Sequence, residues 1–534
     1  MISPVKWLAT ILVCILALTA CTSGEKEATS TSSITLNAQT EPPSLDPALA
    51  IDTTSGWILD HLFEGLYKKD ARGRVVKGVA EKVKVAKDGK TYIFSLKKNA
   101  RWSDGSPLKA KDFEYAWKRV LSPKTASQFA IYLYYLKGGE AYNKGKGTAE
   151  DVGVKATGAH TLKVTLENPV AYFPELLTFW VTYPVKEKVV NQHPKNWFAS
   201  AQTLVSNGAY QLKEWKHNER VIATKNPYYE AKKGIAMERI RWEMVDDSKT
   251  AYQMFKTKKL DVVTDLPADL LVKEKRSEEY KSTPYFGTYM YMLNVKKKPF
   301  TNVKIRKAFN LAIDRESLVK HVTRGGQKPA MAFVPYGFKT PTKGDFRQEE
   351  RSYLQEDVKK ARQLLKEGMK EEGWSKLPPI EITYNTDENH KAIAEAVQGM
   401  VKKNLGVDVK LTNQEWKVYL NTLSQKDYQM ARMGWTGVIV DPVVFLDYYL
   451  GDSPNNQTGW VNKKYDHLMM QAKQEQNEEN RLKLLHQAEG ILMKDLPFIP
   501  IYYYSQNGLV QSDWENIVFR TNRNPDVRWA TQKK

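Results

Sequence analysis

The residue types that commonly do chemistry in proteins are present here, but they form no recognisable catalytic or metal-binding motif. The eight histidines are scattered, and no two stand at the spacing of metal ligands. The chain has neither the His-Glu-x-x-His helix of zinc proteases nor the Gly-x-Ser-x-Gly turn of serine hydrolases. Paired acids such as Asp246 and Asp247 are common on surface turns. We therefore expect no enzymatic activity, no cofactor and no metal.

Two glycine-containing segments match phosphate-binding loops only in part. Residues 88–91 read Asp-Gly-Lys-Thr, like the end of a nucleotide-binding loop, but Lys84 stands where that loop requires its first glycine. Residues 145–147 read Gly-Lys-Gly, like the start of a dinucleotide-binding loop, but Glu150 occupies the third glycine position. We interpret the first segment as a hairpin turn and the second as a solvated loop.

The N-terminal segment has the features of a secretion signal that ends in a lipidation site. A single lysine precedes the apolar run of residues 7–20, which is shorter than the ~20 residues of a comfortable membrane span. The run ends in Leu-Thr-Ala before Cys21, which resembles the bacterial lipobox. We predict that residues 1–20 are removed, that Cys21 receives lipid, and that the Ser/Thr-rich residues 21–34 form a flexible tether. The alternative is an ordinary cleavage site beside a chance cysteine.

Cysteine content, length and charge limit what remains. The other cysteine, Cys14, lies within the predicted signal, so the mature chain has no pair for a disulfide. A chain of 534 residues exceeds a single core, and two or three domains are expected. The net charge of +20 is spread along the chain, which favours a solvated surface facing anionic lipid over a nucleic-acid-binding arm. The same charge leaves a preference for acidic ligands open.

Any site must be positioned by elements that alternate between strand-like and helix-like patterns, which is typical of α/β proteins. Alternating or β-branched runs predict strands at residues 34–38, 91–96, 285–293, 380–384, 407–412 and 497–504. Apolar residues at helical spacing predict helices at residues 54–66, 112–121, 303–322, 355–366 and 391–404, with two more between 465 and 494.

Four short motifs together resemble the peptide- and nickel-binding proteins of ABC importers. They read Gly-Val-Ala-Glu, Asp-Gly-Lys-Thr-Tyr, Arg-Trp-Ser-Asp-Gly and Lys-Asp-Phe, at residues 78–81, 88–92, 101–105 and 111–113. The resemblance covers nearly the whole predicted mature chain, with further matching segments at residues 207–210, 225–229, 299–308, 413–416 and 431–435. Among the subfamilies, the chain is most similar to the oligopeptide-binding proteins.

The resemblance implies an α/β, bilobal, periplasmic-binding-protein-like fold of type II with an additional third domain. The implied ranges are residues 35–78, 200–283 and 500–534 for domain I, 79–199 for domain II, and 284–499 for domain III. Two lobes of such a protein close on the ligand, which favours the closed state through differential contacts. We expect a monomer that hands an oligopeptide to the permease subunits of an ABC transporter. It would be lipid-anchored to the extracytoplasmic face of the cell membrane and would bind no nucleic acid.

The resemblance also implies which residues meet the ligand. Two backbone segments would pair with the peptide as an added strand, and such pairing ignores side-chain identity. Tryptophans and tyrosines would line side-chain pockets, and a retained arginine would meet the ligand carboxylate. For two of the tyrosines, burial in the core is the alternative. The implied ligand-binding residues are Asp52, Thr53, Tyr289, Tyr291, Trp416, Arg432, Gly434, Trp435, Thr436 and Tyr503.

Several positions depart from the pattern of peptide binders. Val438 stands where an aspartate of the best-known members pairs with the free amine of the ligand, and Met292 replaces an acid on the aromatic strand. Leu423 and Ser424 stand where basic residues can meet a ligand carboxylate. These substitutions alter the usual charged anchors of a peptide, while Arg432 is retained.

Three ways of accommodating the ligand amine remain open, because an unpaired buried ammonium costs on the order of several kcal/mol. Either Asp52 or Asp441 supplies the anion, or the amine lies in water, or the ligand has no free amine there. Other ligands also remain open, among them a murein peptide, a metal chelate, haem, a sugar oligomer or a modified peptide. A peptide-sensing or chaperone-like surface lipoprotein is the alternative from another class.

Overall fold

The computed structural model of the chain describes residues 32–341, 344–350, 352–521 and 523–533. The predicted signal at residues 1–20 and the predicted lipidation site at Cys21 lie outside the described residues. Strand β1 begins at Ser33, so the predicted tether at residues 21–34 extends slightly too far into the fold. Within the described residues, no helix is both long and apolar enough to cross a membrane.

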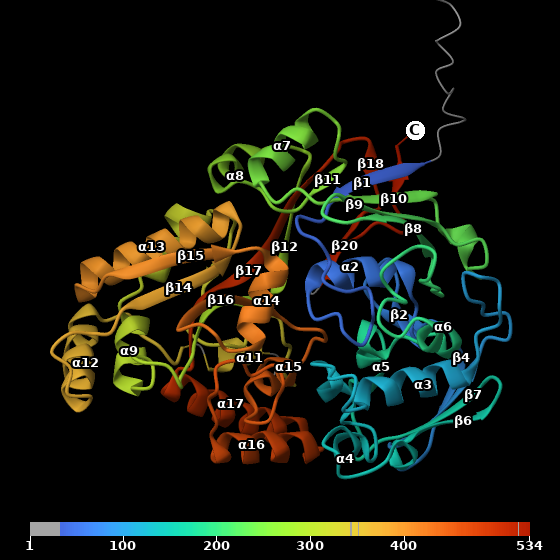
Figure 1. Cartoon of the computed structure of the whole chain (residues 1–534), viewed down its shortest axis with the longest axis horizontal. Helices are drawn as coiled ribbons and strands as arrows, with labels where there is room; N and C mark the ends of the chain where they lie inside the picture. Colours follow the sequence, from blue (N-terminus) through green and yellow to red (C-terminus); the bar gives the residue numbers. More distant parts are fainter. Residues whose placement is uncertain (1–31, 342–343, 351, 522, 534) are drawn as a thin grey trace, which may run out of the picture.

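A long mixed sheet crosses the centre of the molecule (Figure 1). Its strands follow the order β15-β14-β16-β12-β17-β11-β1-β10-β9-β8, and β13 pairs with β17. The two longest strands, β12 and β17, pair antiparallel and connect the two sides of the sheet. The bounds are β1 Ser33–Asn37, β8 Tyr210–Lys216, β9 Arg220–Lys225, β10 Arg239–Glu243, β11 Val262–Val263, β12 Tyr280–Leu293, β13 Lys328–Pro329, β14 Ile380–Asn385, β15 Val409–Gln414, β16 Met430–Thr436 and β17 Phe498–Val510.

Parallel pairing occurs in two separate parts of this sheet. On one side, β1 pairs parallel with β10 and β11. On the other side, β14 pairs parallel with β15 and β16. Three antiparallel contacts, β11 with β17, β17 with β12, and β12 with β16, separate the two sets. The strand direction is therefore reversed between the sets, so the carboxyl ends of β11 and β14 face opposite ways.

A smaller antiparallel sheet has the order β4-β5-β7-β6 and is formed by β4 Ala80–Val85, β5 Thr91–Leu96, β6 Val154–Gly158 and β7 Thr161–Thr165. Helix α3 (Ala110–Leu121) lies beside it, at the lower right of Figure 1. The helix forms where predicted because Phe113, Trp117 and Val120 fall on one buried face. Short two-stranded pairs complete the strands: β2 Tyr67–Lys69 with β3 Val75–Lys77, β18 Trp514–Glu515 with β21 Thr531–Gln532, and β19 Val518–Arg520 with β20 Arg523–Asp526.

The remaining helices surround the sheets and connect their strands. The α-helices are α2 Thr53–Leu62, α4 Gly139–Asn143, α5 Phe173–Leu176, α6 Glu187–Gln192, α7 Ser248–Lys256, α8 Ala268–Glu274, α9 Val303–Leu311, α10 Arg315–Ser317, α11 Phe346–Glu349, α12 Val358–Glu371, α13 Glu388–Leu405, α14 Trp416–Ser424, α15 Val443–Leu446, α16 Lys463–Gln474 and α17 Glu478–Asp495. The others are the 3-10 helices η1 Ala130–Leu133, η2 Ala149–Asp151, η3 Trp180–Thr182, η4 Lys232–Gly234 and η6 Asp447–Tyr449, and the π-helix η5 Leu318–Thr323.

One helix predicted as continuous is interrupted. The pattern at residues 303–322 gives α9, which ends at Leu311, followed by α10 and the π-helix η5. Asp314 starts the new segment by accepting a hydrogen bond from the amide of Ser317. The buried Arg315 side chain then donates to the carbonyls of Asn310, Ile313 and Pro500. Apolar periodicity continues through the break and does not reveal these polar contacts.

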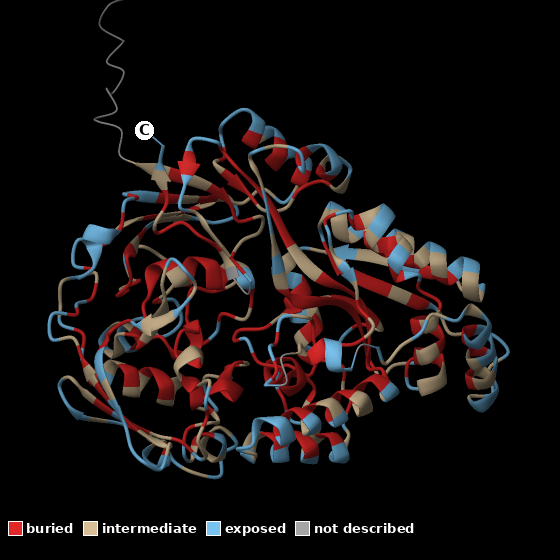
Figure 2. Cartoon of the chain, turned by 180° about the vertical axis from the view of Figure 1, so that it is seen from behind, coloured by how far each residue is buried: buried red, intermediate tan, exposed pale blue. Residues whose placement is uncertain are grey.

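The hydrophobic core does not follow the implied domain ranges. Its largest cluster of buried residues runs from Ile34 to Ala530 and draws on all three ranges. A second cluster surrounds β12, β14 and β17, and a small third cluster lies around α7 and α8. Buried residues are concentrated in the central strands and in the helix faces against them (Figure 2). The ranges are therefore not three separate cores, and the domain boundaries stay a prediction.

Candidate ligand-binding site

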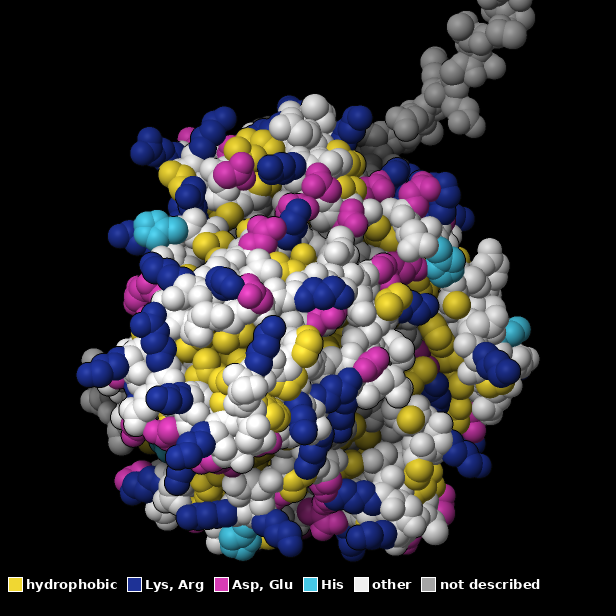
Figure 3. Space-filling view, turned by 60° about the vertical axis from the view of Figure 1, so that its left-hand side comes forward, with side chains coloured by type: hydrophobic (Ala, Val, Ile, Leu, Met, Phe, Trp, Pro, Cys, Tyr) yellow, Lys and Arg dark blue, Asp and Glu magenta, His cyan; other side chains and the backbone are white. Residues whose placement is uncertain are grey.

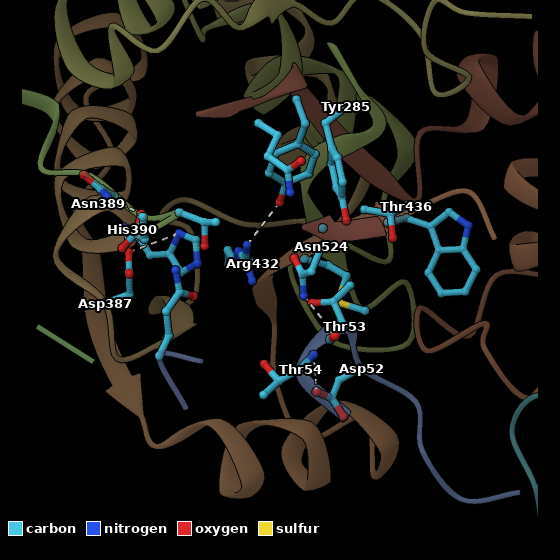
Figure 4. A pocket seen from close by; sticks show the side chains of 18 of the residues that line it. Asp52, Thr53, Thr54, Tyr285, Asp387, Asn389, His390, Arg432, Thr436 and Asn524 are labelled. Carbon is cyan, nitrogen blue, oxygen red and sulfur yellow. Dashed lines mark hydrogen bonds and ion pairs between the residues drawn. The ribbon is translucent and has the colours of Figure 1, made fainter. Parts of the chain in front are cut away.

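A cavity of about 340 Å³ lies between α2, β16, β17 and the start of α13. Its wall combines aromatic rings with a small number of polar and charged side chains, as ligand pockets generally do. Figure 4 shows the polar side chains converging on the cavity from segments far apart in the sequence. The polar and charged residues of the wall include Asn37, Gln39, Asp52, Thr53, Thr54, Asp265, Tyr285, Asp387, Asn389, His390, Arg432, Thr436, Tyr504 and Asn524.

The cavity lies at the carboxyl ends of strands from both parallel sets. Asn37–Gln39 follows β1, Thr264–Asp265 follows β11, and Asp387–His390 follows β14, and residues of all three segments line the cavity. Because the two sets run in opposite directions, their carboxyl ends meet across the cavity from opposing sides. Ligands of open α/β sheets bind at carboxyl ends of strands, and this arrangement supplies two such ends to one ligand.

One edge of β16 is open beside the cavity. On its first edge, β16 pairs with β12 along its whole length, from Thr436 opposite Gly287 to Met430 opposite Leu293. On its second edge, β14 reaches only Met430 and Ala431. Among the described strands, none pairs with the rest of that edge, and residues 432–436 line the cavity. An extended chain in the cavity could therefore add to β16 as a further strand.

Asp52 faces this edge from the N-terminus of α2. Its carboxylate caps the helix by accepting from the amides of Thr54 (2.9 Å) and Ser55 (3.0 Å) and from the Ser55 hydroxyl (2.6 Å). The residue is only 6% exposed, and burial raises the pKa of its carboxyl group despite these hydrogen bonds. The described side chains place no cation within 4.0 Å of it. The carboxylate therefore has no ionic partner in the part of the chain that the structure describes.

Arg432 is the only described arginine or lysine on the cavity wall. Its guanidinium donates to Asn385 Oδ1 and to the Tyr504 hydroxyl, both at 3.1 Å, and lies 4.9 Å from the centre of the Tyr289 ring. Gly434 makes room for the Tyr504 hydroxyl, because a Cβ at this glycine would overlap it. Arg432 is 8% exposed, and no described carboxylate lies within 4.0 Å of its nitrogens.

Two further acids meet at the start of α13. Asp387 caps the helix by accepting from the amide of His390 at 2.7 Å, and Asp265 accepts from Asn389 Nδ2 at 2.9 Å. Burial and the adjacent charge of Asp387 raise the pKa of Asp265 well above its ordinary value. Burial and the neighbouring charge of Arg432 lower the pKa of His390 to about 3, so its imidazole is neutral near neutral pH.

Sequence reasoning missed Asp265, Asp387, Asn389 and His390. The available signal was local. Each aspartate lies two residues after a short buried strand, and Asp387 stands four residues before the helix predicted at 391–404. An Asp at such a position reads as a helix cap, and only the fold brings the Asp265 turn against it.

The two predicted tryptophans both line the cavity. The Trp435 indole donates to the Val444 carbonyl at 2.9 Å, and its ring contacts those of Tyr448 (4.6 Å) and Phe129 (6.5 Å). Trp416 begins α14 beside Asp52. Thr53, Gly434 and Thr436 also lie on the wall, although the Thr53 carbonyl already accepts from Asn524.

The three predicted tyrosines do not line this cavity, and their contact with a ligand stays a prediction. Tyr289 and Tyr291 are fully buried, because Arg432 and the rings of Tyr502 and Tyr504 form the layer between them and the cavity. Tyr503 points to the other face of β17 and donates to the Ala332 carbonyl. Period-two alternation places Tyr289 and Tyr291 on one face of their strand but does not separate the cavity wall from the layer beneath it.

The positions that depart from the peptide-binding pattern also divide between the cavity wall and the protein interior. Val438 lines the cavity, so an apolar surface replaces the expected acid. Met292 lies in the core and accepts a hydrogen bond from the Tyr448 hydroxyl. Leu423 is buried, and Ser424 bonds the end of its own helix.

Of the two acids that could have replaced the missing anion, one is already paired. Asp441 forms an ion pair with Arg481 at 2.5 Å and does not line the cavity. Of the two, only Asp52 lines the cavity.

The fold and cavity define a bilobal α/β protein of the type II periplasmic-binding-protein class. The sequence profile of the bacterial extracellular solute-binding proteins, family 5 (middle region), matches residues 74–457. The chain is 41% identical over 505 residues to the oligopeptide-binding protein OppA of Bacillus subtilis, covering 93% of this chain and 92% of that protein. It is also 41% identical over 509 residues to the dipeptide-binding protein DppE of the same organism, covering 95% and 92%.

The solved structures agree with this assignment. The substrate-binding domain of an oligopeptide ABC transporter from Bacillus anthracis matches with a TM-score of 0.91 and 30% identity, covering 95% of this chain and 99% of that one. OppA of Listeria monocytogenes bound to peptide matches with a TM-score of 0.90 and 30% identity, covering 95% and 100%. The chain belongs to the bacterial extracellular solute-binding proteins, family 5.

Proposed function

We propose that this protein captures oligopeptides in the cavity and delivers them to an ABC importer. The relatives named above are oligopeptide- and dipeptide-binding proteins, and the matched Bacillus anthracis structure is the substrate-binding domain of an oligopeptide transporter. In this proposal the protein acts as a monomer and by binding alone, without catalysis. Domains I and II, with the boundaries given above, form one lobe, and domain III closes against it.

The open edge of β16 is the observation that carries the proposal. A peptide buried in the cavity must satisfy its amide groups, because a buried amide without a partner costs on the order of several kcal/mol. The backbone of residues 432–436 offers such partners on the edge that β14 leaves free. The surrounding tryptophans add apolar surface without selecting one sequence. Together they suit peptides of many sequences.

Two opposite charges fix the direction in which we expect the peptide to lie. Asp52 and Arg432 both face the cavity, and each lacks an ionic partner among the described residues. A peptide in its ordinary form carries one ammonium and one carboxylate. We therefore place the ligand amine toward Asp52 and the ligand carboxylate toward Arg432.

A thermal-shift titration tests peptide capture. A ligand that binds only the folded state raises the melting temperature as its concentration rises above Kd. We expect mixed peptides of three to eight residues to raise the melting temperature, and equal concentrations of free amino acids to leave it unchanged. No shift with any peptide pool contradicts the proposal, and native mass spectrometry of the purified protein then identifies whichever cargo it retains.

We further propose that lipid on Cys21 holds the protein at the extracytoplasmic face of the membrane. The support is the apolar run that ends in small residues before this cysteine. In Cys21→Ser, we expect the protein to leave the membrane fraction. Cys14→Ser, within the signal core, is the matched control and should remain attached. Equal membrane attachment of both variants contradicts the lipid anchor.

A further inference from the structure

The net charge of the cavity wall is opposite in sign to the net charge of the chain as a whole. The chain has 81 lysines and arginines against 61 acids. Figure 3 shows lysine and arginine side chains spread over the outer face, interspersed with acids. Among the described side chains on the cavity wall, the charged groups are Asp52, Asp265, Asp387 and Arg432, with no lysine. A basic protein thus encloses an acidic cavity.

A zwitterionic peptide does not balance these charges. This step rests on the proposed function, in which the ligand amine meets Asp52 and the ligand carboxylate meets Arg432. The ligand termini add one charge of each sign, so they leave the excess of acid unchanged. Asp265 and Asp387 remain without a counter-ion. Because the cavity is largely withdrawn from water, uncompensated charge there is costly.

The described surroundings of the two acids supply hydrogen bonds but no ion pair with a lysine or arginine, and the charge of Arg432 reaches Asp265 only at longer range. Asn389 donates to Asp265, and the amide of His390 donates to Asp387. The His390 ring lies 3.6 Å from Asp387 and is neutral, as its low pKa requires. The described side chains place no lysine or arginine within 4.0 Å of either carboxylate.

Arg432 gives an independent sign that this end of the cavity receives a charged ligand. Its two terminal nitrogens are held by Asn385 and Tyr504, away from the acids. Its Nε has no hydrogen-bond partner among the described residues, although the side chain is only 8% exposed. Buried polar atoms of this kind are rarely left unpaired in a complete site. In Figure 4, Asp387, Asn389 and His390 lie across the cavity from Asp52 and Thr54, with Arg432 between them.

We propose that Asp265 and Asp387 form a subsite for a cationic side chain, so that the preferred ligands are peptides carrying lysine or arginine. An ammonium or guanidinium between the two carboxylates balances one of their two negative charges and takes the place that a proton fills in the empty site. Arg432 then pairs with the ligand carboxylate rather than with the acids. The outer positive charge does not oppose this preference, because salt screens it over about 10 Å whereas the cavity acids touch the ligand.

The subsite predicts release of a proton when a basic peptide binds. In the empty site, burial and the charge of Asp387 raise the pKa of Asp265, so the pair holds a proton to higher pH. The titratable or charged groups that face the pair are His390 on α13, Arg432 on β16, and Tyr502 and Tyr504 on β17. The imidazole is neutral and burial keeps the two phenols protonated, so the proton leaves from the acid pair.

The test uses the purified chain and alanine tetrapeptides in which each position in turn carries lysine, norleucine or glutamate. Isothermal titration gives Kd for each peptide, and repeating it in buffers of different ionisation enthalpy gives the number of protons released. We expect the best lysine peptide to bind at least about tenfold more tightly than its norleucine counterpart. We also expect that only lysine peptides release a proton.

Two variants separate this subsite from a general charge effect. In Asp265→Asn, the ratio of lysine to norleucine affinities should fall toward one, and proton release should disappear. Glu388→Gln removes the same charge one residue from Asp387 on the exposed side of α13, and should keep both. If the ratio is close to one in the unaltered protein, or if both variants keep it, the subsite is wrong.

The remaining outcomes distinguish the two proposals. Binding of norleucine peptides as tight as that of lysine peptides overturns the subsite and leaves peptide capture standing. Binding of no peptide overturns peptide capture itself. Acetylation of the peptide amine tests whether that amine, rather than the side chain, reaches the acids. If acetylation abolishes the effect of Asp265→Asn, the class of basic-side-chain peptides is wrong.

Discussion

Two sets of opposite charges are withdrawn from water: Arg347 and Glu489 in the core, and Arg432 and Asp52 at the cavity. Only the two core residues neutralise each other. Arg347 and Glu489 are ion-paired and fully buried, and the remaining Glu489 oxygen accepts from the amides of Phe333 and Val334. At the cavity, neither Arg432 nor Asp52 has an ionic partner among the described residues. The core pair therefore serves the fold, whereas in the proposed function the cavity charges pair with a ligand.

Breaking the core pair should have the largest effect on stability. In Arg347→Met, Glu489 keeps its charge and its burial but loses its counter-ion. Removing one partner of a buried ion pair typically costs about 3–5 kcal/mol, and urea unfolding measures this as a lower midpoint. Lys297→Met removes an exposed ion pair with Asp427 and is the control, with no resolvable shift expected. A similar midpoint for both variants would show that burial does not separate the two regions.

Removing the positive charge of Arg432 from the cavity should affect binding more than stability. Arg432→Met removes the donor we expect to meet the ligand carboxylate, and hydrogen bonds to charged groups contribute about 1.5–3 kcal/mol, or about ten- to a hundredfold in Kd. Its unfolding free energy should change by less than that of Arg347→Met, because no carboxylate loses its counter-ion. Titration with a bound tetrapeptide measures the affinity. Arg432→Lys keeps the charge and should lose less. Equal affinity losses in the two variants argue against a charge-based contact.

Removing the negative charge of Asp52 should weaken binding less, and only for peptides with a free amine. Asp52→Asn keeps a side chain that caps α2, so the fold should be retained, but it removes the negative charge. We expect peptides with a free amine to bind about tenfold more weakly. Peptides with an acetylated amine should bind both forms equally. A loss of the same size with acetylated peptides would place the amine elsewhere.

Replacing Asp265 of the acid pair should have the smallest effect on stability, and this effect should depend on pH. Because the pKa of Asp265 is raised in the folded protein above its ordinary value of 3.8, the folded state holds the proton more tightly than the unfolded chain does. The contribution of Asp265 to stability therefore falls as pH rises from the ordinary value to the raised one. Asp265→Asn has no proton to lose, so its melting temperature relative to the unaltered protein should rise with pH over this range. Calorimetry without ligand would contradict this if the difference stayed constant.

Much of the local structure could be predicted from the sequence, because it follows from side-chain patterns. The strand at residues 91–96 and the helix at 391–404 were found close to their predicted bounds. Side-chain patterns did not predict the bounds of an element where contacts between distant segments determine where it ends. The helix predicted at 303–322 is interrupted where Arg315 binds carbonyls that include that of Pro500. The C-terminal end of β17 is rich in polar residues, and pairing with β12 rather than hydrophobicity makes it a strand.

The site could be predicted only where a residue carries its own signal. Glycine and tryptophan at 434 and 435 belong to a motif, and both lie on the cavity wall. Tyr289 and Tyr291 share a strand face with wall residues, yet they are one layer too deep. Asp265 and Asp387 are more than a hundred residues apart, and nothing local relates them.

The sequence by itself determined the family resemblance, the alternation of strands and helices, the retained arginine and the loss of the usual acid at Val438. These depend on residue type and short spacing, which the chain carries without folding. The tertiary structure decided which charges face the cavity and which are already paired, as for Asp52 and Asp441. It also brought the two acids of the proposed subsite together. Such relations depend on distances between chain segments that only the assembled sheet brings into contact.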